Sequence, residues 1–325
     1  MRDLIQDVFV GAFDNPLLAR LEDQAVIPLA ELARYGDRLA FTTDTYVVDP
    51  LFFPGGDIGM LAVAGTVNDL AVSGARPLFL SCSMVIEEGF PVELLRRVVA
   101  SMQATATAAG VMIVTGDTKV VERGAADKLF INTAGIGVVR AGVNIAAANA
   151  KIGDVIIVSG HLGDHGAAIL AARNELALET SVESDCCPLN GLIDAILDVC
   201  PAVRSLRDAT RGGAATVLNE FAQSSGLAMR IREAALPIRE EVKGACEILG
   251  LDPLYLANEG KLVAIVPREA ADAVLTAMRS HPAGERAAHV GEVCASPAGM
   301  VVMETSFGGS RIVDMLVGEQ LPRIC

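Results

Sequence analysis

The sequence has 325 residues, about twice the length of a typical domain, and 52% of them are hydrophobic against 20% charged. This balance excludes a disordered chain and can fill a large core, so we expect two folded domains. The formal net charge of −14 and the scattered Lys and Arg residues argue against a nucleic acid partner, because polyphosphate backbones would be repelled.

The sequence shows neither a membrane-spanning nor an export segment. The mean hydropathy of +0.44 is high, yet no run approaches the roughly 18 apolar residues that a spanning helix needs. The first residues, MRDLIQDVF, lack the charged and apolar regions of a signal peptide. Seven cysteines without a Cys-x-x-Cys pair are typical of reduced thiols. We therefore expect a cytoplasmic protein without membrane contact.

The first half of the chain alternates strands and helices. Residues 58–73 are nearly all apolar and predict a buried helix. From Val92 the apolar residues recur at helical spacing until Gly110, a residue type that commonly ends helices. The expected elements are strand 38–48, helix 58–73, strand 77–86, helix 92–109, strand 111–114 leading to an end at Gly116–Asp117, and strand 128–139. They predict an α+β domain with mixed connections.

A second domain is expected after the small, polar stretch at residues 146–153, which precedes a new apolar strand. Strands crossed by helices follow again. The expected helices include 164–176, 189–199, 213–224 and 269–279, and the expected strands include 154–160 and 262–267. We place the domains at residues 1–148 and 149–316, with a tail at 317–325, and assign the chain to the α/β class.

Acidic residues in apolar or strand-end positions are the first candidate site residues. They are Asp44 among threonines in a strand, Asp69 after Asn68 in the apolar helix, Asp117 at a strand end, and Asp208 before a helix. Each alone is most simply a helix cap or part of a buried salt bridge. Together they favour a Mg²⁺ cluster that bridges to phosphates. Neither a G-x-x-x-x-G-K-[ST] nor a G-x-G-x-x-G motif offers another phosphate site.

Two turns between a strand and a helix, at residues 160–166 and 210–213, could present N–H groups to an anion. Such turns are common in α/β proteins and are weak evidence alone. His161 and His165 in the first turn are four residues apart and could share a helical face as zinc ligands. Because no third ligand is evident, we do not favour a zinc site.

Two more residues carry possible chemistry. Glu259 precedes an apolar strand and is either a solvated capping residue or, if burial raises its pKa, a general base. Cys325 is the last residue of the sequence and is either an accidental thiol on a frayed end or a nucleophile that carries an acyl group. The residues after Gly318 could extend about 23 Å, enough to move a thiol between sites.

Several runs of residues share a specific resemblance. They are FTTDTYVVDPLFFPGGDIG, GTVNDLAVSGARP, VTGDTKVVERG, SGHLGDHGAAIL, RDATRGG, LYLANEGKLV and the final PRIC. From about Gly11 to Cys325 the chain resembles the HypE family of hydrogenase maturation proteins, which are carbamoyl dehydratases. This family lies in the superfamily of aminoimidazole ribonucleotide synthetase, thiamine monophosphate kinase and selenophosphate synthetase, and the PRIC end distinguishes it there. The sequence departs from the family pattern at its start, where no HG-x-GG segment precedes the first helix.

The resemblance implies a two-domain α/β fold whose first-domain strands form a barrel across a homodimer. It also implies ATP and Mg²⁺ as cofactors, with ATP in the cleft between the domains. The implied ATP-binding residues are Asp44, Asn68, Asp69, Gly116, Asp117, Thr118, Arg211, Gly212 and Gly213. The implied metal ligands are Asp44, Asp69, Asp117 and Asp208, and we assign Cys325, Glu259 and Lys119 to catalysis.

The implied reaction is an ATP-dependent dehydration on Cys325. The carbamoyltransferase HypF would load a carbamoyl group onto the sulfur, ATP would phosphorylate the carbamoyl oxygen, and loss of phosphate would leave a thiocyanate. We expect Glu259 to take the amide proton and Lys119 to position the γ-phosphate or assist that transfer. The cyanide would pass to iron in the HypC–HypD complex, for a nickel–iron hydrogenase.

Two other functions stay open at this point. Another ATP-using enzyme of the superfamily, such as a small-molecule kinase, would need no terminal cysteine. A catalytically silent scaffold would bind maturation partners without turning over ATP.

Overall fold

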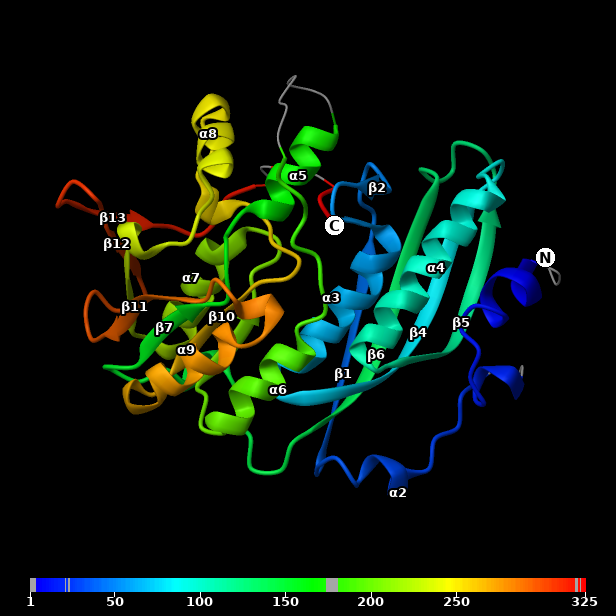
Figure 1. Cartoon of the computed structure of the whole chain (residues 1–325), viewed down its shortest axis with the longest axis horizontal. Helices are drawn as coiled ribbons and strands as arrows, with labels where there is room; N and C mark the ends of the chain where they lie inside the picture. The colour runs from blue at the N-terminus through cyan, green and yellow to red at the C-terminus, as the bar shows by residue number, and fades with distance from the viewer. Residues whose placement is uncertain (1–3, 21, 23, 174–180, 319–320, 322) are drawn as a thin grey trace.

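The computed structural model describes residues 4–20, 22, 24–173, 181–318, 321 and 323–325. Two large β-sheets with their own helices lie side by side, and the chain passes from the first to the second before its end returns to the first (Figure 1). The first sheet uses strands up to Val139 and the second begins at Val155. The boundary predicted at residues 148/149 falls between these two strands.

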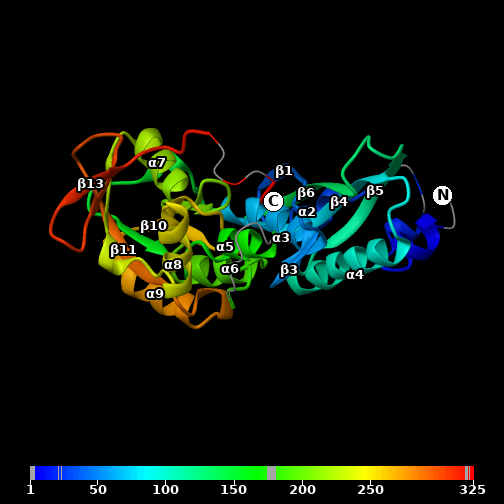
Figure 2. The ribbon, with the colours of Figure 1, turned by 90° about the horizontal axis from the view of Figure 1, so that it is seen from above.

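The first domain is built on a four-stranded sheet in the order β1-β6-β4-β5. β4 and β5 run parallel, whereas β6 is antiparallel to both of its neighbours. α3 and α4 lie on one face of this sheet, as the view from above shows (Figure 2). The elements are α2 Leu29–Leu32, β1 Arg38–Tyr46, β2 Phe52–Phe53, β3 Gly56–Asp57, α3 Ile58–Val72, β4 Ala75–Glu87, α4 Val92–Ala109, β5 Met112–Val121 and β6 Leu129–Val139.

The second domain is built on a seven-stranded sheet in the order β13-β12-β9-β11-β7-β10-β8. Its inner strands β7 and β10 are buried along their whole length, which explains their uninterrupted apolar sequences. The elements are β7 Val155–Val158, α5 Asp164–Ala172, α6 Asn190–Val199, β8 Ser205–Asp208, α7 Gly213–Ser225, β9 Ala228–Arg232, α8 Glu240–Leu249, β10 Leu262–Val266, α9 Ala271–Arg279, β11 Ala288–Cys294, β12 Val301–Glu304 and β13 Ser310–Val313.

The helix α3 joins the two domains. It packs against β1, β4 and β6 of its own sheet and also contacts α6 and β8 of the second domain. A helix covered on both sides has no need of a polar face, which accounts for its almost wholly apolar sequence. Its polar pair, Asn68 and Asp69, is consequently held at the junction between the domains.

The mixed α/β fold class is confirmed, and so is the helix predicted at 92–109. Gly110 follows this helix in the left-handed conformation, with φ of +70°. The helix predicted at 164–176 ends at Ala172, and residues 174–176 lie outside the described part of the chain. Within the described ranges, no helix has both the length and the apolar character that crossing a bilayer requires.

The strand expected to end at Gly116–Asp117 continues to Val121 as β5, which corrects the prediction. Its neighbour explains the glycine, because a Cβ atom on Gly116 would lie 2.1 Å from the carbonyl oxygen of Cys82 on β4. Glycine therefore permits the close pairing of the two strands rather than ending one of them.

Candidate active site

Three carboxylates from distant parts of the sequence face one another at the domain junction: Asp44 on β1, Asp69 on α3 and Asp208 at the end of β8. Thr42 Oγ1 donates a hydrogen bond of 2.9 Å to Asp69 Oδ2. Burial raises the pKa of Asp69, the Thr42 hydroxyl partly offsets this, and the charge on Asp44 raises the pKa again. Burial, together with Asp69 and Asp44, raises the pKa of Asp208 to about 7. The three groups repel one another when ionised.

This arrangement fits a divalent cation. Carboxylate oxygens are the ligands that Mg²⁺ prefers, and a cation would relieve the repulsion that raises these pKa values. In the described part of the chain, no three His, Cys, Asp or Glu side chains lie close enough to hold a metal ion by themselves. Since Mg²⁺ usually keeps waters and substrate phosphates as ligands, the protein would supply only part of the shell. The four-carboxylate cluster therefore stays a prediction.

The predicted residues on β5 lie at the opposite edge of the first sheet. The strand register places Gly116 level with Asp44, three strand spacings away, or roughly 14 Å at the usual spacing. Asp117 is exposed, and its Oδ2 pairs with Lys119 Nζ at 2.7 Å. Gly116, Asp117 and Thr118 line a separate cavity of about 520 Å³ against N-terminal residues. The structure thus does not bring Asp117 and Lys119 to the junction carboxylates of the same chain.

Asn68 ties the two domains together. Its Oδ1 accepts the Leu189 N–H at 2.7 Å, and its Nδ2 donates to the carbonyl oxygens of Cys187 at 3.1 Å and Glu259 at 3.5 Å. The side chain is almost completely buried, and both amide hydrogens have protein acceptors. In this structure Asn68 positions the segments around the site, and its direct contact with ATP stays a prediction.

The turn at Arg211–Gly213 lies where the resemblance predicted it, at the N-terminus of the 13-residue helix α7. Gly213 has φ of +60°, and a Cβ atom there would lie 2.4 Å from the carbonyl oxygen of Leu254. Glycine is therefore needed for this turn to pack against the segment that leads to Glu259. A cavity of 210 Å³ lies beside the turn, lined by Arg211, Gly212 and residues of the tail.

Glu259 is buried beside the junction carboxylates. Asn258 fixes its position, because Asn258 Oδ1 accepts the Gly163 N–H at 2.7 Å and Nδ2 donates to the Ala209 carbonyl at 2.8 Å. Glu259 Oε1 has no hydrogen-bond partner among the described residues. Burial raises its pKa well above the ordinary range, Asp185 and other carboxylates add to the shift, and Arg211 opposes it. The predicted combination of burial and raised pKa is present.

The end of the chain is docked in this site. The Val47 N–H donates to the Cys325 carbonyl oxygen at 3.1 Å, and the Asp49 N–H donates to that of Arg323 at 3.3 Å. Ile324 is 2% exposed and packs into the core of the first domain. Arg211 Nη2 lies 3.5 Å from Cys325 Sγ. Burial, with the nearby charge of Glu259, raises the pKa of this thiol to about 12.

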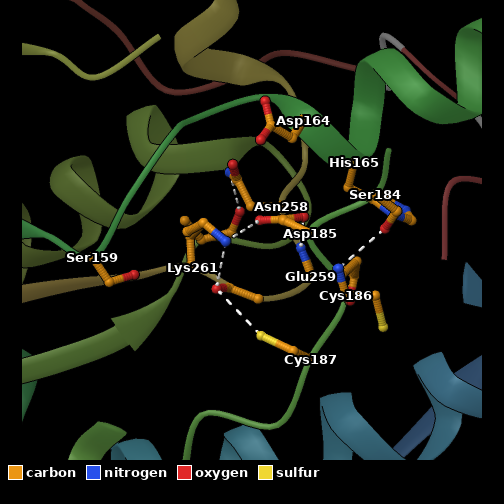
Figure 3. A network of polar contacts seen from close by, with 12 residues as sticks. Ser159, Asp164, His165, Ser184, Asp185, Cys186, Cys187, Asn258, Glu259 and Lys261 are labelled. Carbon is orange, nitrogen blue, oxygen red and sulfur yellow. Dashed lines mark hydrogen bonds and ion pairs between the residues drawn. The ribbon is translucent and has the colours of Figure 1, made fainter. Parts of the chain in front are cut away.

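Asp185 and Lys261, which no sequence pattern singled out, lie close together in the second domain (Figure 3). Lys261 Nζ lies 3.4 Å from Asp185 Oδ2, and Asp185 Oδ1 accepts the Glu259 N–H at 3.0 Å. His165 hydrogen-bonds to Ser184 and to the tail. The structure thus uses His165 within the protein and not as a zinc ligand. Only the motifs ANEGK and GDHG hinted at these residues, since their partners lie far away in the sequence.

The class of the protein follows from fold and site together. Residues 21–139 match the family described as AIR synthase related protein, N-terminal domain, and residues 151–304 match its C-terminal domain. Both carry residues of the junction described above. The chain therefore has the two-domain architecture of the AIR synthase related proteins.

The particular family is shown by closer relatives. Carbamoyl dehydratase HypE of Rhodobacter capsulatus is 59% identical over 100% of this chain and 95% of that protein. The crystal structure of E. coli HypE, a hydrogenase maturation protein, is 54% identical, covers both chains fully and has a TM-score of 0.96. This chain belongs to the carbamoyl dehydratase HypE family, as the sequence motifs indicated.

Two further HypE structures contain ligands or partners. HypE in complex with ATP is 50% identical, with a TM-score of 0.94, over 100% of this chain and 96% of that one. HypE in a HypE–HypF complex is 50% identical, with a TM-score of 0.83, over 96% of this chain and 99% of that one.

Proposed function

We propose that this protein dehydrates a carbamoyl group carried on its own Cys325 sulfur, with ATP, and so supplies cyanide for the iron of a nickel–iron hydrogenase. The observation that carries the proposal is the docked tail, which places the Cys325 thiol beside Arg211 and the buried Glu259. Membership of a family of carbamoyl dehydratases supports the same reaction. A kinase acting on a separate small molecule would have no use for this tail.

The reaction balances as a loss of water driven by ATP. The carbamoyl group S–C(=O)–NH₂ becomes S–C≡N, its oxygen leaves with the phosphoryl group as phosphate, and both N–H protons are given up. ATP, when bound, supplies the phosphoryl group that turns the carbamoyl oxygen into a leaving group. Glu259 is the base that takes an amide proton, because its burial and its carboxylate neighbours make the ionised form a strong acceptor.

Different residues would bind the cation and the nucleotide. Asp44, Asp69 and Asp208 would hold Mg²⁺, which neutralises charge on the phosphates. The Arg211–Gly213 turn at the start of α7 would face the nucleotide with a guanidinium group and helix N–H groups. A similar HypE chain solved in complex with ATP supports ATP as the nucleotide.

We also propose a homodimer. Leu39 and Phe41 on the edge strand β1 are 60% and 72% exposed and point away from α3, an unusual setting for large apolar side chains. Joining the first-domain sheets of two copies would cover them. The exposed pair Asp117 and Lys119 on β5 would then be available to act at the site of the second copy.

The partners follow from the chemistry. A carbamoyl donor enzyme has to load Cys325, and the similar chain solved with HypF supports HypF in this role. The product has to be delivered to an iron site, for which we propose the HypC–HypD complex in the cytoplasm.

Replacing the thiol tests the proposal directly. The Cys325→Ala protein should form no carbamoyl or thiocyanate adduct while binding ATP as the wild type does. Adduct formation is followed by mass spectrometry and ATP binding by calorimetry. Cys294→Ala, on β11 and outside the site, is the matched control and should behave as the wild type. A silent scaffold would show no adduct in any of the three proteins, and ATP-dependent chemistry surviving in Cys325→Ala would point to another substrate.

A further inference from the structure

His165 lies between the second domain and the end of the chain. It is completely buried in the first turn of α5 and packs edge-on against Phe53, with ring centroids 5.5 Å apart. Its Nε2 lies 2.8 Å from the carbonyl oxygen of Ile324, and its Nδ1 lies 2.8 Å from Ser184 Oγ. The Ile324 carbonyl belongs to the peptide bond that directly precedes Cys325.

The partners fix the tautomer of this imidazole. A carbonyl oxygen can only accept, so Nε2 carries the hydrogen and donates it to Ile324. Burial lowers the pKa of His165, although Asp185 opposes the shift, and the ring is therefore neutral. Nδ1 then has no hydrogen and accepts from the Ser184 hydroxyl.

Ser184 is itself held in place. Its Oγ accepts the Cys186 N–H at 3.1 Å, which leaves its own hydrogen for His165 Nδ1. Its backbone N–H donates to the Pro54 carbonyl at 2.8 Å, so the first domain anchors it. A directed series of hydrogen bonds thus runs from the Cys186 N–H through Ser184 and His165 to the peptide bond before the reactive thiol.

We propose that His165 is a positioning residue that holds the peptide bond before Cys325 in place, and with it the sulfur, when the tail is docked for reaction. This inference rests on the proposed function, in which Cys325 carries the group that reacts. His165 does not touch the reacting atoms. Its Nε2–H hydrogen bond fixes the plane from which the Cys325 side chain projects toward Arg211 and Glu259.

The first test measures tail docking without any turnover. Iodoacetamide should modify Cys325 faster when the tail leaves its site, since docking half-buries the thiol and suppresses the thiolate. His165→Ala should raise the modification rate about fivefold, the loss expected for one hydrogen bond. His165→Gln, which keeps an N–H donor and much of the volume, should recover part of the protection. The adduct on the C-terminal peptide is measured by mass spectrometry.

Two matched variants separate this role from general stability. Ser184→Ala keeps the imidazole but removes the donor that selects its tautomer, and it should raise the rate less than His165→Ala does. His289→Ala changes a histidine that bonds within β11, and it should leave the rate unchanged. An unchanged rate in a folded His165→Ala protein, with an unaltered melting temperature, would overturn the proposal.

The second test concerns the reaction itself. With Cys325 already carbamoylated, His165→Gln should slow a single turnover of dehydration while ATP affinity stays as in the wild type. Faster modification of the thiol with unchanged dehydration would contradict the positioning role. If the wild type itself forms no thiocyanate, the proposed function fails, whereas the iodoacetamide measurement still decides whether His165 holds the tail.

Discussion

Glu259 and Cys325 are brought into the same site from positions 66 residues apart, and the charge of Glu259 adds to burial in raising the pKa of the Cys325 thiol. A half-buried thiol with a pKa near 12 is a poor nucleophile, so the docked tail protects the sulfur from other electrophiles. Loading of the carbamoyl group accordingly belongs to an undocked tail. Dehydration belongs to the docked tail, in which Cys325 lies near Glu259. The proposed reaction therefore requires Cys325 to be undocked for carbamoyl loading and docked for dehydration.

Glu259→Gln should bind ATP and accept the carbamoyl group, yet dehydrate about 10²–10⁴-fold more slowly, since the amide cannot take a proton. The pH dependence gives a second signature. Burial and neighbouring carboxylates raise the pKa of Glu259 above its usual 4.5, so the ionised base appears only as the pH rises past that higher value. The wild-type rate should therefore rise with pH along a limb well above pH 4.5.

Single-turnover rates across pH check this prediction. The limb should be missing from Glu259→Gln, while the control Glu247→Gln, at an exposed position on α8, should keep it. An unchanged dehydration rate in Glu259→Gln would remove this residue from the mechanism.

Among the elements, the N-terminal turn of α7 does most to position the base. Gly213 lets this turn approach the carbonyl groups of Leu254 and Leu256, and the chain then continues to Asn258 and Glu259. The left-handed backbone and the close contact both exclude a side chain. α3 performs the corresponding task on the other side of the site, where Asn68 Nδ2 donates to the carbonyl oxygens of Cys187 and Glu259.

Gly213→Ala should destabilise the protein by about 1–3 kcal/mol and reduce dehydration, because the new Cβ atom pushes against the segment that carries Glu259. Gly226→Ala, at the other end of the same helix, is the matched control. It has φ of +68° but open space around it, so it should cost about 1 kcal/mol and leave the reaction unchanged. Thermal unfolding and single-turnover rates report the two effects. Equal effects of the two substitutions on dehydration would contradict the packing argument.

The sequence predicted elements best where the signal is local. The helix at 92–109 combines regular apolar spacing with a terminal glycine, and its bounds were predicted correctly. β5 was predicted too short, because Gly116 looks like a strand end unless the neighbouring Cys82 carbonyl is known. The acidic positions were found individually from their apolar surroundings. Their grouping at the junction, with Asp117 apart, depends on strand order, which spacing along the chain does not encode.

The sequence predicted the reactive residue of the tail but not the residue that contacts the tail. Cys325 was noticed for its chemistry, yet the residue that holds it, His165, was weighed only as a zinc ligand. The contact joins residues 159 positions apart and depends on a backbone carbonyl, which every residue has. The ion pair of Asp185 and Lys261 was not predicted for the same reason, since nothing in the local sequence distinguishes a buried ion pair from a surface one.

At the scale of the whole molecule, the first-domain sheet has helices on one face (Figure 2). Leu39 and Phe41 of its edge strand β1 are exposed. A homodimer that closes this sheet would bury them. It would also bring Asp117 and Lys119 of a second copy into reach of a site that lacks them within one chain. Catalysis and assembly are then coupled.

Phe41→Asp should therefore shift the protein from dimer to monomer and lower its dehydration rate. Phe307→Asp is the matched control, because Phe307 is 99% exposed between β12 and β13 of the second domain. Sedimentation velocity gives the state of each protein. A Phe41→Asp protein that remains dimeric, or a wild type that is monomeric and active, would contradict the assembly.

The central claim is that ATP drives the loss of water from a carbamoyl group on Cys325. The most direct measurement is the mass of the C-terminal peptide after incubation with carbamoyl phosphate, HypF and Mg-ATP, with a non-hydrolysable ATP analogue in parallel. We predict a carbamoyl adduct on Cys325 that loses one water with ATP and keeps it with the analogue. An adduct that never loses water, or a peptide that is never modified, would contradict the account.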